Sequence, residues 1–452
     1  MTVSLLVLDS KMKEKMHVHF MGIGGSGMSA VASIALVYGF KVSGCDLSGP
    51  TIYTRYLEKK GVKILKGHDV SHLKDVDILT VTPAVFDLSP DHPELLEAKK
   101  KKMVLTWQEF MGRFLQEGKF VLCVAGTHGK TTVTAMLGLV LEQAGFDPTV
   151  ELGAIVPQWG VNFRVGKGKY FVCEADEFND NFLNYRPNLI ILTNIEMDHP
   201  EYFKDFADVL ESFANFVRNS KNGILVTCWD DEGVQKLVRQ RLNNWKGGVI
   251  KYSLSQWKEK KIPLKISGDH SRRNVLGVIS AAEVLGIQRE AVKEALEDFS
   301  GLGRRMELVG ELKGVKIFDD YAHHPTQVAA TLQGAREAFS KARIWAVFQP
   351  HMYSRTKVLL DKFKNVFAPA DQVIVVDIFA SREAGDKSKQ TVHAKEVVKI
   401  IKNQNKRYIG KLKRTGEFLA ENVKEGDVVI CMGAGDIYKV SQWLTEKLKV
   451  KN

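Results

Sequence analysis

The stretch Ala125-Gly126-Thr127-His128-Gly129-Lys130-Thr131-Thr132 decides the fold, because of what lies on either side of it. The apolar run Phe120 to Val124 predicts a strand before it, and the pattern from Lys130 to about Ala144 predicts a helix after it. Glycines let the backbone turn tightly, so that N–H groups and the helix N-terminus can face a phosphate. A strand, glycine turn and helix in this order predict a parallel α/β domain that binds a nucleotide.

The residue types in this loop indicate how a nucleotide would be held. Lys130 supplies a mobile cation for the terminal phosphates, and the Thr131 hydroxyl can ligate Mg²⁺. The loop is shorter than the general pattern, because Val124 stands where that pattern has its first glycine. A glycine turn without a ligand is the alternative, but it does not explain Gly-Lys-Thr-Thr at a helix start. The predicted ATP-binding residues here are Gly126, Thr127, His128, Gly129, Lys130, Thr131 and Thr132.

Acidic residues and a histidine follow the next two predicted strands. Tyr170 to Cys173 leads into Glu174-Ala-Asp-Glu177, and Leu189 to Thr193 leads towards Asp198-His199. Sites form at the carboxyl ends of parallel strands, and Mg²⁺ prefers oxygen ligands. Glu174 is therefore a predicted Mg²⁺ ligand. A lone histidine after a strand is more often structural, but at this sheet edge His199 is expected to join a second metal site or orient a phosphate. The predicted metal ligands are Thr131, Glu174 and His199.

A second glycine loop lies near the N-terminus. A predicted strand at His17 to Met21 is followed by Gly22-Ile-Gly-Gly-Ser-Gly27, a helix at about Met28 to Tyr38 and a strand at Lys41 to Cys45. With Asp46 after that strand, the segment fits the dinucleotide fingerprint. Taken alone, it suggests an NAD(P)-dependent oxidoreductase. A dehydrogenase, however, needs no second phosphate loop with Glu174 and His199.

The organisation of the chain indicates three α/β domains. A length of 452 residues is too great for one compact core. Trp107 to Leu115 is expected to be helical, and Gln116 to Lys119 is a plausible linker; Gly301 to Arg305 reads as a second boundary. The predicted domains are residues 1–106, 107–300 and 301–452. Further strands are expected at Asp77 to Val81, Val315 to Phe318, Ile344 to Phe348, Val373 to Val376 and Asp427 to Cys431, with a terminal helix after Asp436.

Composition excludes several classes of protein. No run of 18 apolar residues is present, so a membrane span is not expected, and the N-terminus lacks the basic segment and cleavage site of a signal peptide. The net charge of +11 comes from lysines that are spread out and lack interleaved aromatics, so no nucleic-acid partner is expected. The five cysteines form no CxxC pair, which supports neither zinc nor a disulfide framework and favours a cytoplasmic location.

The motifs taken together resemble those of the Mur ligase family, which builds the peptide of bacterial peptidoglycan and shares its core with folylpolyglutamate synthases. The resemblance runs over essentially the whole chain. Eight ordered segments carry it: His19 to Met28, Ala125 to Thr132, Glu174 to Glu177, Thr193 to Glu196 with Asp198-His199, His270 to Asn274, Gly301 to Arg305, Asp319-Asp-Tyr-Ala-His-His-Pro-Thr326, and Phe348-Gln-Pro-His-Met-Tyr-Ser-Arg-Thr356.

This resemblance implies an N-terminal Rossmann-like domain that binds a UDP-sugar, a central P-loop ATPase-type parallel sheet that binds ATP, and a C-terminal Rossmann-like domain that closes on the nucleotide and amino acid. The segments around His324 and His351 are similar to those of alanine-adding members. The implied reaction joins L-alanine to the carboxylate of UDP-N-acetylmuramate through an acyl phosphate, with ATP and Mg²⁺ as cofactors. A sibling activity, adding a preformed peptide to the same UDP-sugar, is the closest alternative. The protein is expected to be a monomer or weak homo-oligomer.

The resemblance also assigns residues. Catalysis falls to Lys130, Glu174, His199 and Arg355. The remaining nucleotide contacts are His270, Asn274, Arg305 (or Arg304) and Asp320. The UDP-sugar contacts are Gly24, Gly25, Ser26, Gly27 and Asp46. The amino-acid pocket is formed by Tyr321, His324, His351 and Arg355, with Arg355 as the carboxylate clamp; Tyr321 and His323 could instead simply pack under the C-terminal sheet.

The chain departs from the family pattern beside the amino-acid pocket. Met352 stands where an arginine usually follows the Phe-Gln-Pro-His segment, so one expected cation is missing. Arg382, in a segment that also departs from the usual pattern, is a candidate to replace it. A nucleotide-binding switch without catalysis is a further alternative, but it does not explain acids and histidines from several segments.

Overall fold

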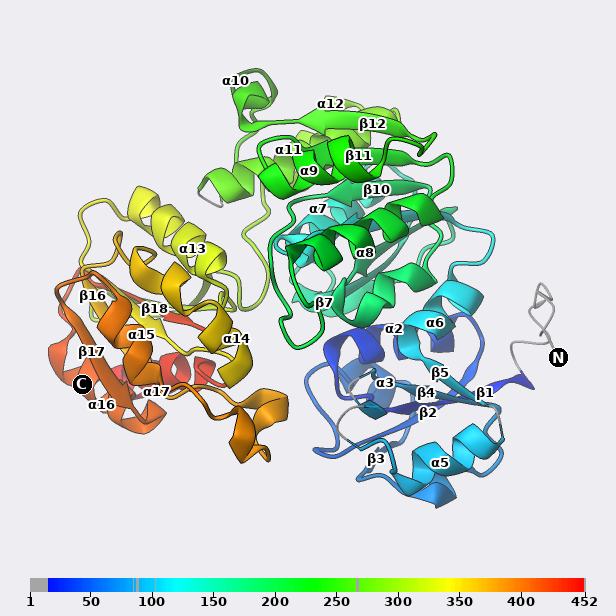
Figure 1. Ribbon diagram of the computed structural model, residues 1–452, viewed down its shortest axis with the longest axis horizontal. Coiled ribbons are helices and arrows are strands. Elements are labelled where there is room, and N and C mark those ends of the chain that lie inside the picture. Colours follow the sequence, from blue (N-terminus) through cyan, green and yellow to red (C-terminus); the bar gives the residue numbers. More distant parts are fainter. Residues whose placement is uncertain (1–14, 84, 87–88, 102, 266–267, 451–452) are drawn as a thin grey trace. The chain divides into compact units, whose positions relative to one another are not determined.

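The computed structural model describes residues 15–83, 85–86, 89–101, 103–265 and 268–450 (Figure 1). The start of the chain, where no signal peptide is expected, therefore lies outside the described residues. The chain divides into two compact units. The first unit comprises Met1–Glu196, Phe206–Pro263 and Asn274–Glu297; the second comprises Met197–Asp205, Leu264–Arg273 and Asp298–Asn452.

The first unit contains an N-terminal sheet of five parallel strands in the order β3-β2-β1-β4-β5. The order reverses beside β1, which is where open α/β sheets place their ligand sites. Leu95 and Ala98 of α5 and Leu73 of η1 pack on one face. The elements are β1 His17–Met21, α2 Ser26–Val37, β2 Lys41–Asp46, α3 Arg55–Lys59, β3 Ile64–Lys66, η1 Val70–Leu73, β4 Ile78–Val81, α5 Pro93–Lys100 and β5 Val104–Thr106.

A helical connection leads to the second sheet of this unit. Thr106 and Glu109 form a capping box at the start of α6 Trp107–Phe110, which satisfies two helix-end N–H groups. The predicted helix over Trp107 to Leu115 is present, but its second half, η2 Met111–Leu115, is a π-helix. Such π-turns are usually short and local.

The second sheet has seven strands in the order β12-β11-β10-β6-β9-β7-β8, parallel except for the β7–β8 pair. Helix α7 packs on β6, β7 and β9, so the loop between β6 and α7 lies at the carboxyl edge of the sheet. The strands are β6 Phe120–Ala125, β7 Thr149–Val156, β8 Val161–Arg164, β9 Tyr170–Ala175, β10 Leu189–Leu192, β11 Ile224–Cys228 and β12 Gly248–Tyr252. The helices are α7 Lys130–Gln143, η3 Phe178–Asn184, α8 Phe206–Asn219, α9 Glu232–Arg241, η4 Leu254–Gln256, α10 Trp257–Lys260, α11 Asp269–Val284 and α12 Arg289–Leu296.

The second unit is built on a six-stranded sheet in the order β13-β14-β18-β15-β16-β17, with β13 antiparallel to β14. The strands are β13 Glu307–Leu312, β14 Val315–Asp320, β15 Ile344–Phe348, β16 Gln372–Val376, β17 Lys406–Gly410 and β18 Val428–Met432. The helices are α13 Pro325–Ala338, α14 Tyr353–Val358, η5 Leu360–Lys364, η6 Ser381–Glu383, η7 Lys387–Lys389, α15 Ala394–Ile400, α16 Leu412–Asn422 and α17 Tyr438–Val450.

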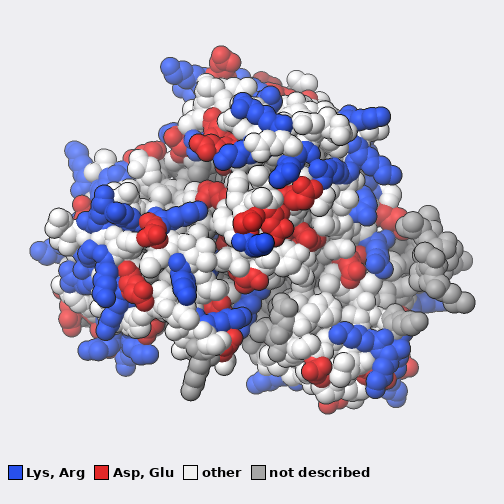
Figure 2. All heavy atoms as spheres, viewed as in Figure 1, with Lys and Arg blue, Asp and Glu red and all other residues white. Residues whose placement is uncertain are grey.

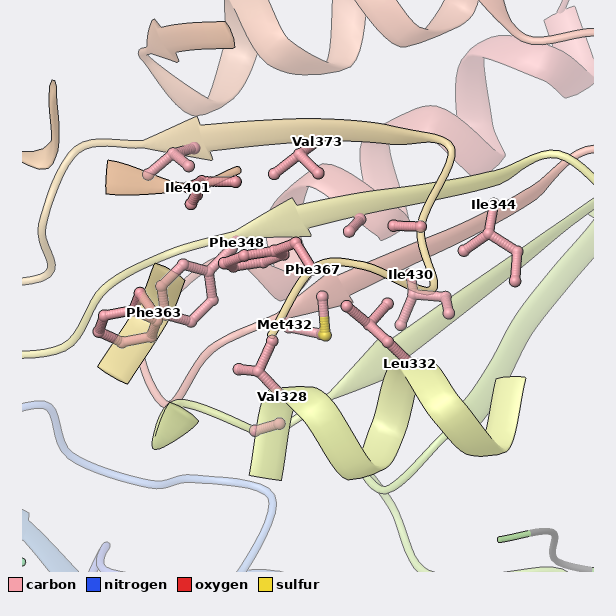
Figure 3. Close-up of a cluster of buried hydrophobic side chains, with 14 of the residues drawn as sticks. Val328, Leu332, Ile344, Phe348, Phe363, Phe367, Val373, Ile401, Ile430 and Met432 are labelled. Atoms are coloured by element: carbon pink, nitrogen blue, oxygen red, sulfur yellow. The ribbon is translucent and has the colours of Figure 1, made fainter. Parts of the chain in front are cut away.

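Both faces of this third sheet are covered. On one face, Val328 and Leu332 of α13 pack with Ile430 and Met432 of β18 and with Phe348 of β15 (Figure 3). The Phe348 ring lies 5.2 Å from that of Phe363 and 5.6 Å from that of Phe367, measured between centroids. The other face is covered by Leu419 of α16 and by Val440, Leu444 and Leu448 of α17. Burial on both faces explains the continuous apolar runs of the central strands.

The predicted three-sheet α/β fold is thus confirmed, and the strands and helices expected from the sequence begin and end within about two residues of their predicted positions. On the face drawn in Figure 2, lysine and arginine side chains are spread over the surface with acidic groups between them. No described helix combines the length and apolarity needed to cross a bilayer.

Candidate active site

The phosphate loop has the geometry that its glycines predict. Gly126 has φ +133° and Gly129 has φ +87°, conformations that side chains other than glycine rarely adopt. A Cβ on Gly126 would collide with the Thr193 hydroxyl. Asn194 fastens the loop from the end of β10, since its Oδ1 accepts from the His128 N–H at 2.8 Å and its Nδ2 donates to the His128 carbonyl at 3.0 Å.

Thr193 and Asn194 therefore form the wall of the loop, a role that the sequence did not reveal. The Thr193 hydroxyl donates to the His128 carbonyl at 2.7 Å, and the Asn194 carbonyl accepts from Thr127 N–H at 3.0 Å. Their position after a buried strand at the sheet edge was the available signal.

Lys130 begins α7 and is held beside the loop by acidic groups. Its Nζ lies 2.6 Å from Glu177 Oε2 and 3.5 Å from Asp176 Oδ1, and it donates to the Gly126 carbonyl at 2.7 Å. Burial lowers the pKa of Lys130, but Glu177 and Asp176 outweigh burial and raise it above its usual value. The lysine is thus a fixed positive charge at the loop. Thr132 follows Thr131 in the first turn of α7.

Glu174 and Thr131 lie together, as predicted for two ligands of one cation. The Thr131 hydroxyl donates to Glu174 Oε2 at 3.0 Å, and Gly153 N–H donates to Glu174 Oε1 at 2.5 Å. Glu151, which the sequence did not single out, is buried on the neighbouring strand β7. Burial first, and Glu174 second, raise the pKa of Glu151 well above its usual value, which favours the neutral form of this neighbouring carboxyl.

Asn274 of α11 also reaches the phosphate loop. A Cβ built on Gly129 would lie 2.8 Å from Asn274 Oδ1, so the amide is packed directly against the loop backbone. The predicted nucleotide contact at position 274 is therefore next to the loop within the first unit.

The N-terminal glycine loop is fastened by Asp46. Its carboxylate accepts from the Gly24 N–H at 3.0 Å and from the Ser48 N–H at 2.9 Å. Gly25 precedes α2 without a side-chain cap, and a Cβ on Gly27 would touch Trp107 at 3.0 Å. Asp46 thus shapes the loop through backbone contacts, and its predicted contact with a sugar hydroxyl stays a prediction.

Ser26 of the N-terminal glycine loop and Glu174 of β9 both lie beside Gly153. A Cβ built there would meet Glu174 Oε1 at 3.3 Å and Ser26 Oγ at 3.7 Å. Asn162 reinforces this approach, because its Nδ2 donates to the Ser26 carbonyl at 2.6 Å. A residue of the predicted UDP-sugar loop and a predicted Mg²⁺ ligand therefore both border Gly153 within the first unit.

Arg355 and His199 lie together in the second unit. Arg355 Nε is 2.9 Å from Asp198 Oδ1, and its Nη2 is 3.1 Å from His199 Nδ1. Burial raises the pKa of Asp198, but Arg355 outweighs it and holds the pKa well below its usual range. His199 has φ +52°, a strained conformation of the kind that concentrates at functional sites. The predicted metal set is thus divided, with Thr131 and Glu174 in the first unit and His199 in the second.

Glu201 joins this cluster and was not predicted. It lies 3.3 Å from His199 Nδ1 and accepts from Arg382 Nη2 at 3.0 Å. Burial opposes ionisation, but His199 and Arg355 lower the pKa of Glu201 to about 2. Arg382, the candidate for a replacement cation, therefore shares a carboxylate partner with His199.

His351 and Met352 follow β15. His351 lies against Phe379, with centroids 5.9 Å apart, and its buried Nδ1 has no hydrogen-bond partner among the described residues. Burial first, and then Arg355 and Arg382, lower the pKa of His351 to about 4. Met352 is buried with φ +62°, and its N–H donates to the Phe379 carbonyl at 2.8 Å. Position 352 therefore belongs to the core.

His324 and Asp320 have local structural partners. The buried His324 caps α13, accepting from the Thr326 N–H at 3.3 Å. Asp320 accepts from the N–H groups of Met306 at 2.8 Å and Ala322 at 2.7 Å. The pKa of His270 is lowered, because burial outweighs the opposing effect of the Asp320 carboxylate. The two predicted nucleotide contacts, His270 and Asp320, are thus close enough to interact within the second unit.

The two arginines at the predicted boundary differ. Arg304 is bound to Asp319 at 3.1 Å and to the Gly433 carbonyl at 2.8 Å. Arg305 stacks on the ring of Tyr321, with its guanidinium 4.8 Å from the centroid. Tyr321 thus has a packing role beside its predicted one.

The chain is similar to known proteins along most of its length. Residues 17–119 match the Mur ligase family catalytic domain, 124–284 the Mur ligase middle domain, and 304–435 the glutamate ligase domain of Mur ligases. The chain is 39% identical to the UDP-N-acetylmuramate–L-alanine ligase of Acetivibrio thermocellus, over 94% of this chain and 95% of that protein. It is 36% identical to the enzyme of the same name from Caldicellulosiruptor saccharolyticus, over 95% and 98%.

A solved structure is also similar. The crystal structure of UDP-N-acetylmuramate–alanine ligase from Thermotoga maritima matches with a TM-score of 0.76 and 28% identity, covering 97% of this chain and all of that one (100%).

Proposed function

The chain belongs to the Mur ligase family, and on this premise we propose that it joins L-alanine to the carboxylate of UDP-N-acetylmuramate while ATP is cleaved to ADP and phosphate. The relatives with this activity in their names are similar to it over nearly their whole length. The product is a precursor of peptidoglycan.

One observation carries the proposal: the approach of Ser26 and Glu174 at Gly153. A ligase of this kind must hold the acceptor carboxylate and the γ-phosphate in contact, and such positioning supplies much of catalysis. Ser26 comes from the loop expected to bind the UDP diphosphate, and Glu174 comes from the ATP site. A dehydrogenase gives no reason for Ser26 and Glu174 to lie beside the same residue.

The reaction has two balanced steps. In the first step, an oxygen of the lactyl carboxylate attacks the γ-phosphorus of ATP. The bond between this phosphorus and the β,γ-bridging oxygen breaks, and the products are ADP and an acyl phosphate. The alanine amine then attacks the acyl carbon, loses a proton, and phosphate departs from the tetrahedral intermediate. In the first step Lys130 would neutralise charge on the phosphates, since electrostatic stabilisation dominates phosphoryl transfer.

The residues at the phosphate loop fit Mg²⁺. The Thr131 hydroxyl and the Glu174 carboxylate are oxygen ligands that already lie 3.0 Å apart, which suits a hard divalent cation. When bound, Mg²⁺ would withdraw charge from the phosphate oxygens. His199 remains the proposed third ligand from the second unit.

We assign alanine recognition to the cluster around Arg355. Its guanidinium is the proposed clamp for the amino-acid carboxylate, and His351, whose Nδ1 has no partner in the described structure, is a proposed additional contact. Arg382 is proposed to supply the cation that Met352 does not. Since Arg304 is already bound to Asp319 and to main-chain carbonyls, Arg305 is the preferred candidate for the nucleotide.

ATP and a UDP-sugar as substrates place the proposed reaction in the cytoplasm. The protein is proposed to act as a monomer or weak homo-oligomer, with no nucleic-acid partner.

The test is phosphate release from ATP with UDP-N-acetylmuramate and a panel of amines. We expect release that requires Mg²⁺, the UDP-sugar and L-alanine together. Lys130→Met should lower kcat by about 100-fold or more, because one electrostatic contact to the transition state is lost. Lys246→Met, at an exposed lysine of the same unit, is the matched control and should retain activity.

Other outcomes would redirect the proposal. Release with a tripeptide but not with L-alanine would assign the sibling activity. Release that ignores every amine, or NADH formation with a UDP-sugar, would contradict a ligase altogether. Alanine KM in Arg382→Ala and Arg355→Ala separates the two arginines: an unchanged KM in the first with a raised KM in the second would remove Arg382 from the pocket.

A further inference from the structure

Four side chains that can each bind a metal ion lie together between the N-terminal sheet and the helices α5 and η1 that cover it. His19 on β1 and Cys45 on β2 point to the same face, because their strands are paired in register with His19 opposite Ser43. His72 comes from η1, and Glu94 comes from the first turn of α5. His19, Cys45 and Glu94 are fully buried, with 0% exposure.

Four ligating atoms of this group, one per side chain, lie within 4.8 Å of one another. His19 Nε2 is 3.3 Å from Cys45 Sγ and 3.4 Å from Glu94 Oε1. Glu94 Oε1 is also 3.7 Å from both Cys45 Sγ and His72 Nδ1. In a tetrahedral Zn²⁺ site the ligand atoms are separated by roughly 3.3–3.7 Å, as the usual bond lengths require. Four of the six distances between the ligand atoms therefore already have the length that a tetrahedral zinc site needs.

The hydrogen bonds behind His19 fix which of its nitrogens faces the group. The Asp75 carbonyl can only accept, so His17 Nδ1 donates to it at 2.8 Å. With His17 neutral, its Nε2 accepts from the Ser43 hydroxyl at 2.7 Å. The Ser43 oxygen then accepts from His19 Nδ1, also at 2.7 Å, which leaves the Nε2 lone pair aimed at Cys45 and Glu94. A ligating histidine is held in this way by a hydrogen bond to its other nitrogen.

Without a cation, the group is poorly compensated. Within the described chain, Glu94 has ion-pair distances only to histidines, not to any lysine or arginine. His72 Nδ1 is buried and has no hydrogen-bond partner among the residues that the structure describes. Burying a carboxylate beside neutral groups alone is costly, whereas a bound divalent cation would satisfy Glu94, His72 and the His19 lone pair together.

We propose that a structural Zn²⁺ ion is bound by four side chains of the N-terminal sheet: His19, Cys45, His72 and Glu94. Binding releases the proton of the Cys45 thiol to solvent, and the thiolate, two imidazoles and carboxylate complete a closed tetrahedral set. His68 Nδ1 lies 3.0 Å from Cys45 Sγ and borders the group on its partly buried side. The absence of CxxC spacing gave no hint of this site, because the ligands come from four separate segments.

The ion would join β1, β2, η1 and α5. Cys45 directly precedes Asp46, whose carboxylate holds the Gly24 N–H, so the metal would also steady the base of the N-terminal glycine loop. The metal-binding proposal stands apart from the proposed ligase activity, and either can fail without the other.

The experiment is a Co²⁺ titration of the full-length protein after its metal has been removed with a chelator. Co²⁺ replaces Zn²⁺ and gives a thiolate-to-metal absorption band, which the oxygen ligands of the nucleotide site cannot produce. We expect one equivalent per chain, loss of the band on adding Zn²⁺, and retention of the band in Glu174→Gln. Ser43→Ala, which removes the hydroxyl that links His19 to His17 but no proposed ligand, should weaken Zn²⁺ binding about 10-fold.

Variants locate the site. Cys45→Ser should abolish the thiolate band and weaken Zn²⁺ binding at least about 10-fold, whereas Cys431→Ser, at a buried cysteine of the second unit, should bind as the parent protein does. If Cys45→Ser does not fold, the titration of the parent protein still decides. No thiolate band in the parent, or the same band in both cysteine variants, would overturn the proposal and leave the group as a proton-sharing cluster.

Discussion

The surroundings of His351 hold its pKa well below the usual value of a histidine. Burial and two nearby arginines lower its pKa to about 4 from 6.5, so the unfolded chain takes up the proton first as the pH falls. The stability that this neutral ring contributes is complete above pH 6.5 and is lost between 6.5 and 4. At about pH 5 the loss amounts to about 2 kcal/mol.

His351→Phe keeps a ring against Phe379 but cannot take up a proton. We therefore expect urea unfolding at about pH 7.5 and about pH 5 to show a smaller decrease in the free energy of unfolding for the variant than for the parent. His323 and Glu201 will retain part of the pH dependence in both. A His393→Gln variant, at an exposed histidine, is the control and should show the same decrease in unfolding free energy as the parent. An equal decrease in His351→Phe and the parent would contradict the role given to His351.

At this scale the sequence predicted residue types but not their partners. Lys130, Thr131 and Glu174 could be predicted because a phosphate loop and a strand end restrict where their side chains lie. Two contacts could not be predicted: the ion pair of Arg355 with Asp198, and the hydrogen bond from the Gly24 N–H to Asp46. Both depend on distances between segments that are far apart in the chain. Spacing alone carries no such information.

At the scale of elements, the shape of the β6–α7 loop depends on the backbone conformation of Gly126. Gly126→Ala places a methyl group at φ +133° and against the Thr193 hydroxyl, so the loop must move away from its wall. We expect the ATP KM to rise at least about 10-fold, since the N–H groups no longer converge on the phosphates. Steady-state kinetics with varied ATP measures this directly.

Gly145→Ala is the matched control. Gly145 also has positive φ, +76°, at the end of α7, but a Cβ there meets no atom within 4 Å. This variant should lose about 1 kcal/mol of stability from backbone strain and keep its ATP KM. If both variants changed KM alike, strain in general rather than the shape of the loop would be responsible.

The elements themselves were largely predictable, since buried parallel strands such as β15 are apolar runs and α7 has a clear start. The π-helix at Met111–Leu115 was not, because a helical pattern does not distinguish i+4 from i+5 hydrogen bonding. The β7–β8 pair was also missed, although it carries Glu151 and Gly153 next to Glu174. The pairing of β7 with β8 and β9 brings Glu151 and Gly153 next to Glu174, and this pairing cannot be inferred from the sequence pattern.

At the scale of the whole molecule, the proposed reaction requires the UDP-sugar site and the ATP site to come together, and Ser26 and Glu174 both border Gly153. Gly153→Val would insert methyl groups between Ser26 and Glu174 without touching the phosphate loop itself. Because misplacement of reacting groups by about 1 Å can cost about 100-fold, we expect kcat/KM for ligation to fall by about 100-fold. Binding of ADP alone should weaken much less, since Lys130 and the loop are intact.

Gly248→Val provides the control for this last prediction. Gly248 begins β12 in the same sheet, is exposed, and has no atom within 4 Å of a built Cβ. Valine suits a strand, so activity should stay within about twofold of the parent. The comparison uses phosphate release for ligation and fluorescence titration for ADP. Equal turnover by the two valine variants would mean that the approach of Ser26 and Glu174 does not matter for ligation. A parallel loss of ADP binding in Gly153→Val would instead place the effect at the nucleotide site alone.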